Sequence, residues 1–167
     1  MSAFRVLVLC TGNSARSQIA EALLATRGAQ RKRGPVHAAS AGSRPAPRVN
    51  PFAVEVLALH GILWGDRTPK SIDQMATEQF DLVITVCDNA RDACPIFPGA
   101  DVQIHWGLPD PAEEQDPETA REAFEATYRA LESRITALLA LPLGELSAGE
   151  LRIAATAIHA ASPEPEW

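Results

Sequence analysis

Three residues near the start of the chain have the types and spacing of a nucleophile at an oxyanion site. Cys10 ends an apolar, β-branched run, and Arg16 and Ser17 follow it in the order C-x5-R-S. A guanidinium presents a planar fork of N–H donors that suits two oxygens of a tetrahedral anion. A cysteine beside such a cation and a helix start is a thiolate near neutral pH. The pattern therefore predicts a thiolate nucleophile that faces a bound oxyanion.

The loop that follows Cys10, "CTGNSARS", has the residues that an anion-binding turn requires. Gly12 can adopt a positive φ, and Asn13 is the non-glycine residue type that tolerates it best. A nucleotide-binding loop is excluded, because it needs a lysine followed by Ser or Thr. A buried cysteine beside an ordinary turn and helix cap is the alternative. The predicted oxyanion-binding residues are Thr11, Gly12, Asn13, Ser14, Ala15, Arg16 and Ser17.

The other two cysteines, Cys87 and Cys94, lie close together in "TVCDNARDACPIFPG". Three cysteines are an odd count, which in a reducing compartment favours thiols over structural bridges. C-x6-C lacks the tight spacing of zinc ligands, and the four histidines are scattered along the chain. No metal site is therefore predicted from these residues.

These residues need elements to position them, and the hydrophobic pattern predicts an alternation of strands and helices. Strands are predicted at residues 4–9, 36–42, 80–87 and 102–106. Helices are predicted at residues 17–28, 51–59, 117–141 and 147–161, with a helical turn at 71–75. The alternation predicts a single α/β domain, with a small parallel sheet of about four strands and helices on both faces. Cys10 and Cys87 end two of these strands, so they should meet at one edge of the sheet.

Length and composition set the wider limits. The 167 residues suit one domain, divided here into a catalytic part, residues 1–145, and a C-terminal extension, residues 146–167. A net charge of −6 argues against a nucleic-acid or acidic-membrane partner. The first apolar run, Val6 to Cys10, is too short for a signal peptide or a membrane span. A cytoplasmic location is expected.

Four motifs together resemble the low-molecular-weight protein tyrosine phosphatase fold, and within it the arsenate reductases. They are "CTGNSARSQIAEA" (10–22), "SAG" (40–42), "VITVCDNARDACPIFPG" (83–99) and "HWGLPDPA" (105–112). The resemblance implies arsenate as the substrate, with phosphate or sulfate as analogues, and Asp110 as the general acid. Phosphatases of this fold carry tyrosines beside that aspartate, whereas Pro111 and Ala112 follow it here and the only tyrosine is Tyr128. A phosphotyrosine substrate is therefore disfavoured.

Arsenate reduction needs two electrons, which three cysteines can supply in a relay. Cys10 attacks arsenate, Cys87 attacks the adduct at sulfur, and Cys94 exchanges into the resulting disulfide. A helix over 87–94 would separate its ends by roughly 10 Å, whereas a disulfide needs Cα atoms within about 7 Å. The Cys87–Cys94 bridge therefore requires local unfolding. The resemblance implies no bound cofactor and an external reductant, which is thioredoxin, glutaredoxin or a low-molecular-weight thiol.

The resemblance also raises the question of a monovalent-cation site near the Cys10 loop. Asn13, Glu21 and Ser40 match residues that bind potassium in some members, but a further acidic position is Lys70 here. The ammonium group of Lys70 is expected to take the cation's place, so no metal is predicted. Trp64 is expected at the surface near the active face.

Two other functions share the Cys10 motif. One is a low-molecular-weight phosphatase that hydrolyses phosphate monoesters, with Cys87 and Cys94 protecting Cys10 by oxidation. The other is a non-catalytic oxyanion or redox sensor that signals through its disulfide.

Overall fold

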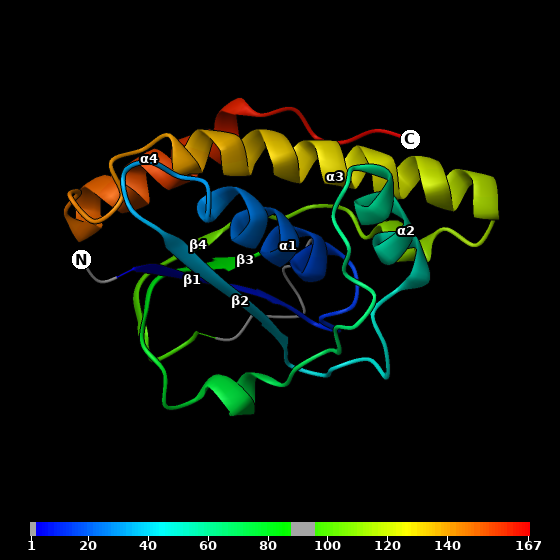
Figure 1. The fold of residues 1–167 in the computed structure, drawn as a ribbon, viewed down its shortest axis with the longest axis horizontal. Helices are drawn as coiled ribbons and strands as arrows, with labels where there is room; N and C mark the ends of the chain where they lie inside the picture. Colours follow the sequence, from blue (N-terminus) through cyan, green and yellow to red (C-terminus); the bar gives the residue numbers. More distant parts are fainter. Residues whose placement is uncertain (1–2, 88–95) are drawn as a thin grey trace.

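Four parallel strands form the centre of this computed structural model, which describes residues 3–87 and 96–167. They are β1 (Phe4–Cys10), β2 (Val36–Gly42), β3 (Phe80–Thr85) and β4 (Ala100–His105), in the order β2-β1-β3-β4 (Figure 1). Leu9 pairs with Thr85 and Cys10 pairs with Gly42, so the carboxyl ends of the three strands lie side by side. The predicted α/β class with a small parallel sheet is confirmed.

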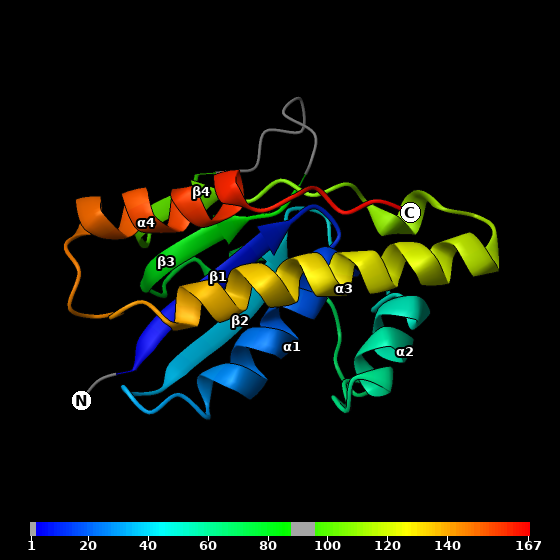
Figure 2. The same ribbon diagram turned by 90° about the horizontal axis from the view of Figure 1, so that it is seen from above.

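Helices cover the sheet on both faces, as predicted, but unevenly. The α-helices of the described residues are α1 (Arg16–Gly28), α2 (Pro51–Leu59), α3 (Pro117–Leu139) and α4 (Ala148–Ala161). All four lie over the same face (Figures 1 and 2), where their apolar residues join the side chains of Val6, Val8, Leu82 and Ile84 in one core. The 3-10 helix η1 (Ile72–Met75) covers the opposite face, where Met75 packs with Leu7, Leu9 and Val83.

Side chains that cap the first turns explain where several helices begin. The Asn50 side chain accepts a hydrogen bond from the Phe52 N–H at 2.9 Å, and Pro51 occupies the first turn of α2. Ser147 and Glu150 form a capping box at the start of α4. These caps satisfy backbone N–H groups that a helix cannot satisfy itself, so the local sequence sets both boundaries.

The C-terminal extension packs against the rest of the fold through α4. The indole N–H of Trp106 donates to the Ala155 carbonyl at 2.9 Å, and the Arg152 guanidinium donates to the Gln103 carbonyl at 2.9 Å. The division into residues 1–145 and 146–167 stays a prediction. Within the described residues, no helix is both long and apolar enough to span a membrane.

A buried arginine on α3 finds two of its hydrogen-bond acceptors in the extension and a third in the Ala130 carbonyl of its own helix. Arg134 is 1% exposed, and its guanidinium donates to His159 Nδ1 at 3.0 Å and to the Pro163 carbonyl at 3.2 Å. An imidazole nitrogen that accepts a hydrogen bond carries no proton, so this contact requires neutral His159. Burial, and then the charges of Arg134 and His105, lower the pKa of His159 from its ordinary 6.5, while Glu164 opposes the shift.

The protein should therefore lose stability in mild acid. Because the folded-state pKa of His159 is lowered, the unfolded chain takes up the proton first. Protonation of His159 therefore costs no stability above about pH 6.5. Below that pH it lowers the free energy of unfolding by an amount that grows as the pH falls. The measurement is the urea midpoint of unfolding between about pH 8 and about pH 5. His159→Asn keeps an acceptor for Arg134 but cannot be protonated, so it should flatten the pH dependence. An equal pH dependence in both proteins would refute this role.

Candidate active site

Cys10 lies at the carboxyl end of β1, where polar hydrogens surround its sulfur. It is a free cysteine and is 4% exposed. The Asn13 N–H donates to Cys10 Sγ at 3.1 Å, and Ser17 Oγ lies 2.8 Å from the same sulfur. Both groups can donate a hydrogen bond to this sulfur, which fixes its position in the loop.

Backbone hydrogen bonds from residues 43–50 orient the Cys10 loop, residues 10–17. Four of the loop's carbonyl groups accept bonds from outside it. The pairs are Ser43 N–H to Cys10 O at 3.3 Å, Arg44 to Thr11 at 2.9 Å, Ala46 to Gly12 at 2.9 Å and Asn50 to Ser14 at 2.9 Å. In a planar trans peptide, the C=O and the next N–H point in opposite directions. Because these carbonyls face outward, the N–H groups that follow them face the inside of the loop. This arrangement forms a nest of donors for an anion.

Two backbone positions make this loop possible. Asn13 has a φ of 49°, in the left-handed region, as its residue type predicts. Gly42, which pairs with Cys10 across the sheet, lies directly against the loop. A Cβ at this position would lie 2.4 Å from the Thr11 carbonyl oxygen and 2.9 Å from the Asn13 nitrogen. The "SAG" motif contained this glycine, but its reason, the close approach of two backbones, could not be read from the sequence.

The start of α1 has no side chain that competes with an anion. The residue before the helix is Ala15, which forms no side-chain cap, and the first turn has no acidic residue. The N–H groups of this turn therefore have no side-chain acceptor, unlike those of α2 and α4. The helix dipole adds partial positive charge at the same point. An oxyanion in the loop would accept hydrogen bonds from these N–H groups, and its negative charge would interact favourably with the helix dipole.

Arg16 connects the nucleophile loop to the ends of β3 and β4. Its guanidinium is largely buried and donates to the Leu108 carbonyl at 2.7 Å and to the Val86 carbonyl at 3.4 Å. A second guanidinium nitrogen lies 3.6 Å from Asp110 Oδ2. The predicted anion ligand and the predicted acid are therefore brought together.

Asp110 caps the 3-10 helix η2 (Pro111–Glu113) with one carboxyl oxygen. Its Oδ1 accepts the Ala112 N–H at 3.0 Å, while Oδ2 faces Arg16. The side chain is 29% exposed, so the carboxyl group can exchange protons with water. One oxygen fixes the orientation, and the other is placed to give a proton to a group beside Arg16.

Cys87 lies two residues beyond the end of β3, the strand that pairs with the strand ending in Cys10. The Val86 N–H donates to the Leu9 carbonyl at 3.0 Å. Cys10 directly follows Leu9 in the sequence, and Cys87 directly follows Val86. Cys87 is 4% exposed, as Cys10 is. Cys87 is disulfide-bonded in this structure, whereas Cys94, the predicted Cys87–Cys94 pairing and the predicted unfolding of this segment lie outside the described residues.

The residues predicted for a monovalent cation do come together, and Lys70 lies with them. The Asn13 side-chain amide donates to both Ser17 Oγ and Ser40 Oγ at 2.8 Å. Ser40 Oγ donates to Glu21 Oε1 at 2.5 Å, and Lys70 Nζ lies 3.3 Å from that oxygen. The ammonium group thus neutralises a buried carboxylate two hydrogen bonds behind Asn13. Among the described residues, no three His, Cys, Asp or Glu side chains are grouped to hold a metal ion.

Sequence reasoning missed a second support of the loop. The Gln18 side-chain amide donates to the Asn13 carbonyl oxygen at 3.1 Å and to Asn13 Oδ1 at 3.0 Å. The indole N–H of Trp64 in turn donates to Gln18 Oε1 at 2.8 Å. Trp64 is 4% exposed, so the expectation that it lies at the surface is wrong. Gln18 lies in the quoted 10–22 motif, but nothing local indicated its partner 46 residues away.

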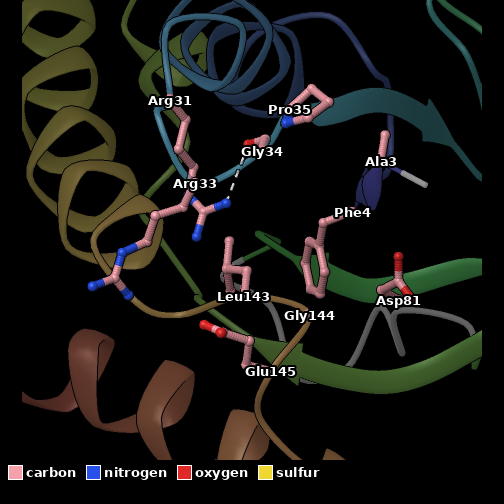
Figure 3. A pocket seen from close by; sticks show the side chains of 10 residues that line it. All are labelled: Ala3, Phe4, Arg31, Arg33, Gly34, Pro35, Asp81, Leu143, Gly144 and Glu145. Atoms are coloured by element: carbon pink, nitrogen blue, oxygen red, sulfur yellow. Dashed lines mark hydrogen bonds between the residues drawn. The ribbon is translucent and has the colours of Figure 1, made fainter. Parts of the chain in front are cut away.

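A separate cavity of about 720 Å³ opens at the opposite edge of the sheet (Figure 3). Phe4 and Asp81, at the amino ends of β1 and β3, line it together with Arg31 and Glu145. The seven residues of β1 span about 20 Å between this edge and Cys10. The Arg31 guanidinium donates to the carbonyl groups of Gly34, Leu139 and Leu141. This cavity therefore contributes nothing to the Cys10 site.

Comparison with known proteins agrees with this geometry. The low molecular weight phosphotyrosine protein phosphatase family matches residues 5–148. An arsenate reductase of Halalkalibacterium halodurans is 37% identical over 107 residues, which are 64% of this chain and 73% of the relative. The structure of an arsenate reductase in the phosphate binding state gives a TM-score of 0.68 at 26% identity, over 82% of this chain and 97% of that one. A thioredoxin-dependent arsenate reductase of Corynebacterium glutamicum gives 0.56 at 31%, over 80% and 62%.

Replacing Gly42 by Ala should damage anion binding. The added Cβ would push the Thr11 carbonyl and the Asn13 nitrogen out of place. We expect the dissociation constant for phosphate to rise at least about tenfold, which is about 1.4 kcal/mol. Titration calorimetry measures it. Gly65→Ala is the matched control, because a Cβ there would meet only Val54 Cγ1 at an ordinary 3.9 Å. Equal phosphate affinity in Gly42→Ala and the unsubstituted protein would contradict the steric argument.

Removing the Lys70 ammonium should destabilise the fold through Glu21. Lys70→Met leaves a buried carboxylate with Arg67 as its nearest remaining cation, at 3.9 Å. We expect a loss of about 2 kcal/mol, less than for a fully buried pair because Lys70 is partly exposed. Glu21→Gln in the same chain should restore most of it, and a double-mutant cycle from urea unfolding measures the coupling. Strictly additive effects would show that the two residues do not interact.

Proposed function

The chain belongs to the low molecular weight phosphotyrosine protein phosphatase family, and we propose that within this family it is an arsenate reductase. The observation that carries the proposal is the placement of Cys87 at the strand end next to Cys10. A phosphatase needs only the Cys10 loop, Arg16 and Asp110, whereas a reductase also needs a second cysteine beside the first. The named similarity to arsenate reductases supports the same choice.

The first step forms a covalent adduct on Cys10. The inward N–H groups of the loop and Arg16 bind arsenate, whose charge they balance. The Cys10 thiolate attacks arsenic, an arsenic–oxygen bond breaks, and the departing oxygen takes a proton from Asp110 and leaves as water. Because Asp110 Oδ2 lies 3.6 Å from the Arg16 guanidinium, the proton donor is beside the bound anion.

The second step moves two electrons to arsenic. The Cys87 thiolate attacks Cys10 Sγ, the sulfur–arsenic bond breaks, and its electron pair stays on arsenic, which leaves as arsenite. The two sulfurs are thereby oxidised to a Cys10–Cys87 disulfide. The Cys94 thiolate then attacks Cys87, which forms the Cys87–Cys94 disulfide and returns Cys10 as a thiolate.

An external thiol must reduce this disulfide after each turnover. A thioredoxin-dependent arsenate reductase is among the structural relatives, so thioredoxin is the proposed reductant, and glutaredoxin or a small thiol is the alternative. Thioredoxin requires a reducing compartment, and the proposed location is the cytoplasm, with arsenate detoxification as the role. Arsenate-dependent NADPH consumption with thioredoxin and its reductase, run beside glutathione and glutaredoxin, distinguishes the reductants.

A specific observation weakens the alternative of a phosphotyrosine phosphatase. Tyr128, the only tyrosine, is 2% exposed and stacks on the His60 ring, with 3.9 Å between the ring centroids. The residues beside Asp110 are Pro111 and Ala112, which offer no aromatic face to a substrate ring. A substrate of this site would therefore be small.

Cys94→Ser separates the candidate functions. A reductase of this type should release about one arsenite per enzyme and then stop, because the Cys10–Cys87 disulfide cannot be resolved. Cys87→Ser should release none. The measurement is the amount of arsenite formed per enzyme, by chromatography coupled to elemental detection. Continued turnover of phosphate esters by Cys94→Ser would instead favour a phosphatase. No turnover of either anion by the unsubstituted protein would favour a sensor.

A further inference from the structure

The C-terminal extension contacts both ends of the segment that contains Asp110. This segment, residues 106–114, is called the acid segment below. It starts after β4 and ends after η2. The family match ends at residue 148, at the start of α4, so nearly all of the extension lies outside it. Figure 2 shows the tail running from α4 toward the acid segment.

The first contact fixes the start of the acid segment. Trp106 is 1% exposed, and its indole N–H donates to the Ala155 carbonyl in α4 at 2.9 Å. Its backbone N–H donates to the Thr85 carbonyl at 2.7 Å. Trp106 is therefore held on one side by β3 and on the other by the extension.

The second contact fixes the far end of the acid segment. The indole N–H of Trp167 donates to Glu114 Oε1 at 3.0 Å. The Glu114 N–H donates to the Pro111 carbonyl at 3.3 Å, so this contact leads back to the turn that Asp110 caps. Along the tail, the Pro163 carbonyl accepts from Arg134, which ties the tail to α3.

Between these two contacts, Arg16 is the partner of the acid segment. The Leu108 carbonyl accepts from Arg16 at 2.7 Å, and Asp110 Oδ2 lies 3.6 Å from the same guanidinium. The backbone bonds that orient the Cys10 loop come instead from residues 43–50. The backbone of the Cys10 loop and the acid segment therefore have separate supports, which Arg16 joins. Of the contacts described, only those of the acid segment involve the extension.

We propose that the C-terminal extension is a positioning element for the acid, and that Trp106 and Trp167 are positioning residues that hold Asp110 beside Arg16. The proposal rests on the proposed function for the role of Asp110 as acid. A displacement of about 1 Å in a catalytic group can reduce a rate by about a hundredfold. Loosening either end of the acid segment should therefore slow the chemical step while the anion still binds.

The test uses two variants of the 167-residue chain that each delete one indole N–H donor, beside two controls. Trp106→Phe and Trp167→Phe delete the indole N–H but keep an aromatic ring. We expect kcat for arsenate to fall at least about threefold in each, with KM and the dissociation constant of phosphate unchanged. Glu114→Gln keeps an acceptor for Trp167 and should stay near the unsubstituted protein. Ile153→Ala is the control for a change in the extension, because this side chain of α4 is 73% exposed.

A double substitution tests whether the effect passes through Asp110. In an Asp110→Asn background, Trp167→Phe should cause no further loss of kcat, because the positioned acid is already absent. A further loss of the same size would overturn the proposal. So would a parallel loss of phosphate affinity in both tryptophan variants, which would indicate a general structural effect.

Hydrogen exchange gives a readout that does not depend on the proposed reaction. Amides of residues 107–114 should exchange faster in both tryptophan variants, while those of the Cys10 loop and α1 stay unchanged. Unchanged exchange in the acid segment would overturn the proposal even if arsenate reduction is correct. If the unsubstituted protein reduces no arsenate, the proposed function fails, and the exchange pattern alone decides whether the extension fixes this segment.

Discussion

The outward orientation of four carbonyl groups in the Cys10 loop is the constraint on which the rest of the site depends. Backbone N–H groups between Ser43 and Asn50 hold these carbonyls, and planar peptides then turn the intervening N–H groups inward. The Asn13 N–H consequently reaches Cys10 Sγ, and the other inward groups surround the position of an oxyanion. Gly42 permits this arrangement, because any Cβ there would occupy the space of the loop backbone.

Charge is distributed around this loop in two layers. In front, Arg16 lies between the ends of β3 and β4 and faces Asp110, so that an anion, its counter-charge and a proton donor share one space. Behind, the Asn13 side chain leads through Ser40 to the buried carboxylate of Glu21, which Lys70 neutralises. The Lys70 ammonium group lies 3.3 Å from this carboxylate, and its replacement of a cation from solution stays a prediction.

Local patterns in the sequence predicted most of the fold and the core of the site. Residues 4–9 and 80–87 were predicted as two strands because each contains a short, continuous run of apolar, β-branched residues. The C-x5-R-S motif was visible because its residues are contiguous in the sequence. The uneven covering of the sheet could not be predicted, because periodicity shows that a helix face is buried but not which sheet face it covers. Partners distant in sequence were also hidden. Trp106 and Ala155 are separated by 49 residues. Arg134 and His159 lie on two helices whose sequences showed no sign that they contact each other.

In the proposed reaction, Cys10 and Cys87 together donate two electrons to one bound arsenate. The most direct test is peptide mapping by mass spectrometry of Cys94→Ser, reduced beforehand and then given arsenate without any external thiol. The relay predicts that a Cys10–Cys87 disulfide accumulates in proportion to the arsenite released, and that no such bond forms with phosphate in place of arsenate. If Cys10 and Cys87 both remain open to alkylation after arsenate treatment, the relay is wrong.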